Sequence, residues 1–93
     1  MKPLVSVIIP IYNAAPFLKE TLDSVMESTY RPIEVIMIDD GSKDNSLAIA
    51  QEYCSTNQAC KVYSQKNQGV SVARNNAIRK AQGTYILPVD ADD

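Results

Sequence analysis

The sequence predicts an α/β fold in which a mostly parallel β-sheet is covered by helices on both faces. Short runs rich in β-branched residues alternate with longer segments whose apolar residues recur at helical spacing. Turn-forming residues separate these segments, and strands joined through helices of this length imply right-handed crossovers. The expected order is therefore β-α-β-α-β-α-β, a Rossmann-like arrangement.

The first half of the chain supplies two strands and one helix. LVSVIIP, residues 4–10, is a β-branched run suited to a fully buried strand. A helix can begin at Pro16. Its apolar stripe is Leu18, Leu22, Val25 and Met26. The segment STYRP then breaks the helix, and IEVIMI, residues 33–38, forms a second strand that ends in Asp39 and Asp40.

A second helix and a third strand come next. The turn sequence GSKDNS offers Ser42 and Asp44 as N-cap residues. The inner stripe of the helix is Leu47, Ala50, Tyr53 and Cys54. KVYSQ, residues 61–65, is a short third strand.

The third helix and the fourth strand complete the pattern. The helix begins after KNQG, and Gly83 is its expected C-cap. One face of the helix carries Val70, Ala73, Ala77 and Ala81. Residues 85–89 form the fourth strand, in which Pro88 removes a ladder donor. We therefore expect a bulge or an unpaired N–H at Pro88.

Composition restricts the class of protein. The 93 residues are 45% hydrophobic, which is typical of one small globular domain. A net charge of -2 gives no electrostatic footprint for nucleic acid or an anionic membrane. The N-terminal apolar run leads to no small-residue cleavage site and is far shorter than the roughly 20 residues of a membrane span, so we interpret it as a strand.

Histidine is absent, and cysteine is scarce. The lack of histidine excludes Ser-His-Asp and Cys-His chemistry from these residues, so any metal must be held by oxygen ligands. Cys54 and Cys60 do not form a C-x-x-C motif. We interpret them as two small half-buried residues, which favours a cytosolic setting, with a disulfide or redox pair as the alternative.

Polar clusters stand directly after all four predicted strands. They are PIYNAA, DDGSKD, KNQG and DADD, in chain order. The carboxyl ends of parallel strands share one edge of the sheet, and ligands of open α/β sheets bind there. The sequence therefore predicts a binding site at this edge.

The two acidic clusters have both functional and structural interpretations. Asp39 and Asp40 can belong to the site, or they can be a strand end and a turn residue before Gly41. Asp90 and Asp92 form a D-x-D, which can hold Mg²⁺ or Mn²⁺ from one short segment and bridge it to phosphates. The alternative is a solvated acidic segment at a chain end.

Phosphate binding by a glycine-rich loop is not indicated. The chain has three glycines, at positions 41, 69 and 83, and neither G-x-G-x-x-G nor G-x-x-x-x-G-K-[ST]. A phosphate here would need a metal, a cation or a helix N-terminus. Arg74, in the first turns of the third helix, can supply the positive charge, or it is a solvated surface residue.

Four blocks of the sequence together resemble family 2 glycosyltransferases, which have the GT-A fold. The blocks are SVIIPIYN, EVIMIDDGSKDNS, NQGVSVARNNAI and GTYILPVDADD, and they span essentially the whole chain in the family's order and spacing. The resemblance implies binding of a nucleoside diphosphate sugar, usually with inverting transfer of the sugar to an acceptor.

The resemblance also implies roles for single residues. The first block places Pro10, Tyr12 and Asn13 beside the nucleobase and ribose. In the second, Asp40 accepts a hydrogen bond from the base, with Asp39 close by. The remaining implied residues are Asn67, Gly69 and Arg74 near the nucleotide, Asp90 near the ribose, and Asp92 as the ligand of Mn²⁺ or Mg²⁺.

The resemblance further implies a domain organisation. Residues 1–93 correspond to the N-terminal donor-nucleotide-binding part of a GT-A domain, ending just after the D-x-D. The family's catalytic base and acceptor site lie downstream, so the acceptor and the sugar are not identified. We expect a cytoplasmic protein, peripheral to the cytoplasmic face of the membrane in its full-length form, and self-association through surface that the short sheet exposes.

Three other classes of protein are alternatives. A non-catalytic nucleotide-binding module differs from the enzyme only in the residues beyond Asp93. A nucleotidyltransferase usually carries a glycine-rich, arginine-containing loop after its first strand, and PIYNAAPF is not one. A phospho-receiver domain would need an acidic pair after its first strand, which here ends in Pro10.

Overall fold

The computed structural model describes residues 2–28 and 30–91. Its elements, in chain order, are β1 (Val5–Ile11), α1 (Ala15–Glu27), β2 (Ile33–Asp40), α2 (Ser46–Ser55), β3 (Cys60–Gln65), α3 (Val70–Lys80) and β4 (Tyr85–Pro88). All strand pairs are parallel, and the order across the sheet is β3-β2-β1-β4. The predicted α/β fold and element order are confirmed.

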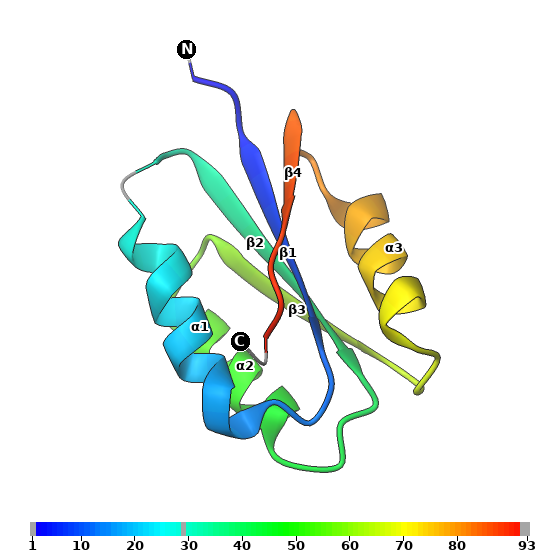
Figure 1. Cartoon of the computed structure of the whole chain (residues 1–93). Coiled ribbons are helices and arrows are strands. Elements are labelled where there is room, and N and C mark those ends of the chain that lie inside the picture. The colour runs from blue at the N-terminus through cyan, green and yellow to red at the C-terminus, as the bar shows by residue number, and fades with distance from the viewer. Residues whose placement is uncertain (1, 29, 92–93) are drawn as a thin grey trace.

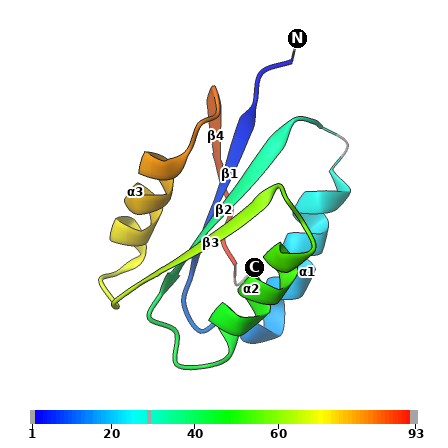
Figure 2. The same ribbon diagram turned by 180° about the vertical axis from the view of Figure 1, so that it is seen from behind.

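The sheet separates two apolar cores. Helices α1 and α2 cover one face, and α3 covers the other (Figures 1 and 2). Because successive side chains of a strand point to opposite faces, alternate residues of β1 and β2 enter different cores. The first core includes Val7, Ile9, Val35, Met37, Leu18 and Leu22. The second comprises Ile8, Ile36, Ile38, Ala73 and Ala77.

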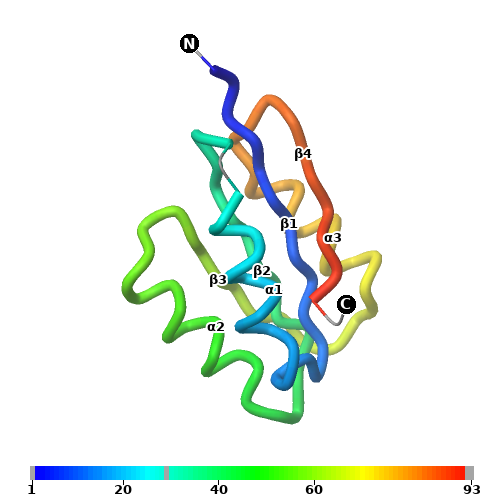
Figure 3. Tube along the Cα trace, turned by 60° about the vertical axis from the view of Figure 1, so that its left-hand side comes forward, coloured from blue at the N-terminus to red at the C-terminus, as the bar shows by residue number. Residues whose placement is uncertain are grey.

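Strand β4 lies at the edge of the sheet, beside β1 (Figure 3). Its register against β1 runs without interruption to the pair Ile8 and Pro88, so of the two expectations for Pro88 the bulge is wrong. The Val89 N–H donates to the Ile8 carbonyl at 3.0 Å. Since alternate residues of a parallel strand bond to a given neighbour, the nitrogen of Pro88 faces the open edge, where a proline costs no ladder bond.

The predicted cap of α2 is wrong in detail. The N-cap position is Asn45, whose side chain makes no capping hydrogen bond. Asp44 instead accepts hydrogen bonds on Oδ1 from the Ser46 N–H at 2.9 Å and the Ser46 hydroxyl at 2.5 Å. These bonds, the hydroxyl bond first, lower the pKa of Asp44 below its usual value despite partial desolvation.

Gly83 does not cap α3, which ends at Lys80 with Ala81 as the C-cap residue. The Gly83 N–H donates to Ser6 Oγ at 2.9 Å. A Cβ at this position would lie 2.8 Å from the Leu4 carbonyl oxygen and still closer to Ser6 Oγ. Glycine is therefore required because the chain entering β4 passes close to β1, and the C-cap prediction mistook a packing constraint for a helix end.

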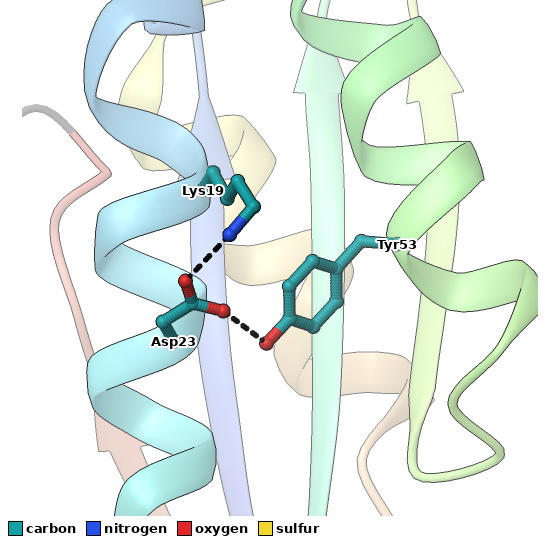
Figure 4. Close-up of polar contacts among 3 residues, drawn as sticks. All are labelled: Lys19, Asp23 and Tyr53. Atoms are coloured by element: carbon teal, nitrogen blue, oxygen red, sulfur yellow. Dashed lines mark hydrogen bonds and ion pairs between the residues drawn. The ribbon is translucent and has the colours of Figure 1, made fainter.

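Tyr53 of α2 joins the two helices on the first face. Its hydroxyl donates to Asp23 Oδ1 at 2.9 Å, and Lys19 donates to Asp23 Oδ2 at 2.9 Å (Figure 4). Burial, together with the bond to Asp23, raises the pKa of Tyr53 to about 12. Cys54 and Cys60 are free thiols. Cys54 is half-buried, as the sequence interpretation proposed, whereas Cys60 is buried in the first core. Burial raises the pKa of Cys60 to about 12.

We expect the protein to lose stability between about pH 9 and 12. The pKa values of Tyr53 and Cys60 are both about 12 in the folded chain, above the values of about 10 and 8.5 for free side chains. The folded state therefore keeps protons that the unfolded state releases, so this stability is complete below the unfolded pKa values and is lost as pH rises toward 12. Urea unfolding of wild type and Tyr53→Phe at pH 7, 9 and 11 measures it. The free energy of unfolding of Tyr53→Phe should fall less steeply above pH 10 than that of wild type. Parallel falls in the two proteins would contradict the role of Tyr53.

Within the described part of the chain, no helix combines the length and the apolar character that crossing a membrane requires.

Candidate functional site

The carboxyl ends of β1, β2 and β3 meet at one edge of the sheet, at the lower end of Figure 1. Ile11 lies opposite Asp39 in the register of β1 and β2. Asp40 lies opposite Gln65 in the register of β2 and β3. The polar clusters at the ends of these strands are therefore neighbours in space, as the sequence predicted.

Asp40 is the best-connected polar side chain at this edge. Its residue is 3% exposed. Oδ1 accepts hydrogen bonds from Gln65 Nε2 and the Gln68 N–H, both at 2.8 Å. Oδ2 accepts from the Gly69 N–H at 3.0 Å and, at 3.4 Å, from Asn67 Nδ2. One carboxylate thus accepts hydrogen bonds from residues 67–69 of the loop between β3 and α3 and from Gln65 at the end of β3.

The electrostatics of Asp40 result from these bonds. Desolvation by burial is the largest single influence and acts to raise its pKa. The bonds from Gln65, Gln68 and Gly69 outweigh it together, so the pKa of Asp40 lies below its usual value. The side chain is therefore ionised at neutral pH, and an ionised carboxylate can only accept hydrogen bonds.

Asp40 faces a pocket of about 190 Å³. The pocket is lined by Pro10, Ile11, Tyr12, Asp40, Asn67, Gly69 and Val70. Five of the predicted site residues are in this lining, and Tyr12 is 46% exposed. The arrangement combines an apolar wall, an exposed aromatic ring and a fixed anionic acceptor, which suits a flat heterocycle that bears an N–H.

Asn13 does not line this pocket. It has a positive φ of 50°, and its Oδ1 accepts a hydrogen bond from the Lys43 N–H at 2.7 Å. Its own N–H donates to Ser42 Oγ at 2.9 Å. The first loop is thereby braced on the loop after β2.

The brace continues into the start of α1. The Ala14 N–H donates to the buried Ser46 hydroxyl at 2.9 Å, and the Ala15 N–H donates to Asp44 Oδ2 at 3.2 Å. Sequence reasoning assigned Ser42 and Asp44 to the cap of α2 and did not foresee that they bind another loop. The available signal was the placement of two turn-rich segments after adjacent strands.

Asp39 is separated from Asp40 by the sheet itself. Because neighbouring residues of a strand point to opposite faces, Asp39 lies on the face of α1 and α2. Its Oδ2 accepts from the Ser42 N–H at 3.1 Å. Its buried Oδ1 has no hydrogen-bond partner among residues 2–28 and 30–91. Adjacency in sequence therefore does not bring both carboxylates into the pocket.

The remaining predicted residues are Arg74 of α3, and Asp90 and Asp92 of the segment after β4. Asp90 is exposed, and its Oδ1 lies 4.0 Å from Arg74 Nη2 of α3, a distant and solvated ion pair. Ala91 is buried in the first core, and its carbonyl accepts a hydrogen bond from Thr21 Oγ1 at 3.2 Å. The structure thus brings Arg74 and Asp90 together and anchors the chain beside Asp90.

The predicted metal ligand, Asp92, lies outside the described residues. Among the residues that are described, no group of three or more histidine, cysteine, aspartate or glutamate side chains is arranged to hold a metal ion. The carboxylate chemistry of the D-x-D suits a hard cation.

Comparison with known proteins identifies the family. The family model described as glycosyl transferase family 2 matches residues 6–93. An uncharacterized glycosyltransferase, EpsJ of Bacillus subtilis, is 46% identical over 93 residues, which are 100% of this chain and 27% of the relative. The chain therefore spans about a quarter of that relative's length.

Solved structures that share the fold include a mannosyltransferase and TarS. The mannosyltransferase PcManGT from Pyrobaculum calidifontis, in complex with GDP-Man and Mn²⁺, superposes with a TM-score of 0.89 at 31% identity, covering 99% of this chain and 28% of that protein. Residues 1–349 of S. aureus TarS, in complex with UDP-GlcNAc, give a TM-score of 0.87 at 35% identity, covering 99% of this chain and 27% of that one. The chain belongs to glycosyl transferase family 2 and has the architecture of GT-A glycosyltransferases.

Proposed function

We propose that this chain is the donor-binding part of an inverting glycosyltransferase that uses a nucleoside diphosphate sugar. The observation that carries the proposal is the pocket at the carboxyl edge, in which Asp40 is fixed as an ionised acceptor beside Tyr12 and Asn67. It is supported by family membership and by structural neighbours that hold sugar nucleotides.

The hydrogen-bonding state of Asp40 favours a base with a ring N–H. An acceptor-only group pairs with the ring N–H on the Watson–Crick edge of uracil, thymine or guanine, whereas cytosine and adenine present a bare ring nitrogen there and can donate only from their exocyclic amino group. The nucleotides bound by TarS and PcManGT contain uracil and guanine, which agree with this preference. We propose a uridine diphosphate donor, with the base against Tyr12 and Asp40.

We propose that the D-x-D segment contacts the diphosphate. We propose that Asp92 ligates Mn²⁺ or Mg²⁺ and that Asp90 lies near the ribose. The cation, when bound, stabilises the negative charge that develops on the departing diphosphate. Arg74 and the N-terminus of α3 add positive potential on the same side. Support for the cation comes from the carboxylate pair and from the Mn²⁺ complex of PcManGT.

We predict that UDP binds more tightly in the presence of Mn²⁺ or Mg²⁺ than in EDTA. The chain has no glycine-rich phosphate loop, so the diphosphate needs a cation to offset its charge. Calorimetric titration of UDP with and without the cation measures the effect. Asp92→Ala should lose the dependence on metal while Asp92→Glu retains part of it. Equal affinity of the wild-type chain in both conditions would contradict the role given to Asp92.

A non-catalytic nucleotide-binding module is the second candidate. It would share the pocket and the metal dependence, so binding alone does not separate it from the enzyme. Turnover by a full-length protein that contains this segment separates them. A nucleotidyltransferase would instead release pyrophosphate from a nucleoside triphosphate.

We predict that copies of this chain associate through β4. The strand has an open edge without a charged residue, and Tyr85 and Leu87 are 60% and 51% exposed. The adjoining groove between the sheet and α1, about 390 Å³, has Val5, Val7, Val25 and Leu87 among its lining residues. Open apolar edges pair with other strands. Light scattering after size exclusion should show a concentration-dependent rise in mass that Leu87→Lys reduces. A monomer at all concentrations would refute this interface.

A further inference from the structure

Two side-chain amides form a chain that ends on Asp40. Asn76 of α3 donates through Nδ2 to Gln65 Oε1 at 2.5 Å. Gln65, the last residue of β3, donates through Nε2 to Asp40 Oδ1 at 2.8 Å. Gln65 and Asn76 are both partly buried, and Asn76 lies outside the lining of the Asp40 pocket.

The order of these bonds fixes the direction of the Gln65 amide. An amide has one accepting and one donating end, and Asn76 occupies the accepting end. The donating end is therefore turned toward the carboxylate. If the amide were reversed, its oxygen would face the ionised Asp40, and two acceptors would repel.

The two oxygens of Asp40 also differ in the hydrogen bonds that they accept. Oδ1 has two short bonds, from Gln65 and from the Gln68 N–H. Oδ2 has one bond of 3.0 Å from the Gly69 N–H and one long contact of 3.4 Å with Asn67. Oδ2 is thus the oxygen with accepting capacity left for a ligand in the pocket.

We propose that Gln65 and Asn76 are positioning residues of the nucleotide site, which hold Asp40 so that Oδ2 meets the N–H of the base. The inference rests on the proposed function. In this proposal the preference for a base with an N–H depends on Asp40, Gln65 and Asn76, although Gln65 and Asn76 do not contact the base. Asn76 acts only through the orientation of Gln65.

The variants Gln65→Met, Asn76→Ala and Asn76→Asp separate the two roles. Gln65→Met keeps the length of the side chain but removes the donor, and we expect UDP binding to weaken about tenfold, the effect of losing one hydrogen bond to a charged group. Asn76→Ala leaves Gln65 able to donate and should weaken binding less than about threefold. Asn76→Asp supplies an acceptor that attracts Gln65 Nε2 and reverses the amide, so it should weaken binding at least tenfold.

The ratio of UDP to CDP affinity is the specific readout, because a general loss of structure lowers both affinities together. Gln65→Met and Asn76→Asp should lower this ratio. Gln51→Glu, an exposed position on α2, adds the same charge as Asn76→Asp and should change neither affinity. In a Gln65→Met background, Asn76→Asp should have no further effect, because the residue through which it acts is gone.

A second measurement does not depend on nucleotide. Amide hydrogen exchange at Gln68 and Gly69 reports their bonds to Asp40. It should accelerate in Gln65→Met and Asn76→Asp but not in Asn76→Ala, while exchange in β1 and β2 stays unchanged. If wild type fails to bind UDP but the variants differ from it in exchange as expected, the proposed function fails and the positioning role stands.

The proposal is overturned by either of two results. Asn76→Asp and Asn76→Ala could weaken UDP binding equally, or Asn76→Asp could act fully in the Gln65→Met background. Both would show that Asn76 does not act through the Gln65 amide.

Discussion

Replacing Asp40 with alanine is expected to weaken UDP binding by about 10- to 150-fold, the range for a hydrogen bond to a charged group. It should also lower the free energy of unfolding by about 2–4 kcal/mol, because the donors of Gln65, Gln68 and Gly69 lose their acceptor. That is a large share of the roughly 5–15 kcal/mol of a typical domain. Dependence on the divalent cation should persist, since Asp40 belongs to the base end of the site.

Asp23→Ala is the matched control for Asp40→Ala. It removes a carboxylate that accepts bonds from Lys19 and Tyr53 on the far side of the sheet. Urea unfolding should show destabilisation in both variants, but calorimetry should show weakened UDP binding only in Asp40→Ala. If Asp40→Ala remained folded and bound UDP like the parent, the pocket could not be the nucleotide site.

The 93-residue chain is expected to transfer no sugar to acceptors, although a full-length protein that contains it should do so. Transfer needs a base within reach of the acceptor hydroxyl. Three described carboxylates at this edge are poorly suited to be that base. Asp40 accepts hydrogen bonds on both oxygens, Asp39 is buried, and Asp90 is paired with Arg74. Acceptor positioning, which can supply several kcal/mol of barrier reduction, also has no assigned residues here.

The measurement is release of UDP from a UDP-sugar, monitored with and without candidate acceptors for the short and full-length proteins in parallel. The donor-binding step should be present in both, so UDP affinity serves as the internal control. Acceptor-dependent turnover by the short chain at the full-length rate would show that a carboxylate within these residues is the base.

The sequence predicted the elements of the fold because each has a local signature. β-branched runs indicated the strands, and apolar residues at helical spacing indicated the helices. The predicted helix faces lie in the two cores except at Leu47, which is in neither core, and Val70, which is exposed. Strand order is not a local property. Pro88 therefore suggested a bulge, whereas the edge position of β4 accommodates it without one.

The residues that line the pocket were predicted more completely than the residues that hold them in place. Pro10, Tyr12, Asp40, Asn67 and Gly69 meet because strand ends share one edge. The separation of Asp39 from Asp40 is also a result of strand alternation, although the sequence interpretation did not apply it.

The hydrogen-bond partners of Asp40 and of the loop after β1 could not be predicted from strand alternation or from the position of the strand ends. Gln65 meets Asp40 through the register of β2 and β3, and Asn76 meets Gln65 through the rotation of α3. Ser46 reaches Ala14 across 32 positions of the chain. Such contacts depend on how finished elements pack, and no short pattern encodes them.

The position of β1 has a consequence for synthesis of the chain on the ribosome. β1 is made before the other strands described here, yet one of its two neighbours is β4, with Val5 opposite Tyr85. One side of this apolar strand therefore stays unpaired until almost the entire segment has emerged. Pairings so distant in sequence form slowly, and open strand edges invite wrong partners in the meantime. Nascent chains paused before residue 85 should thus be more dependent on chaperones than chains released after it.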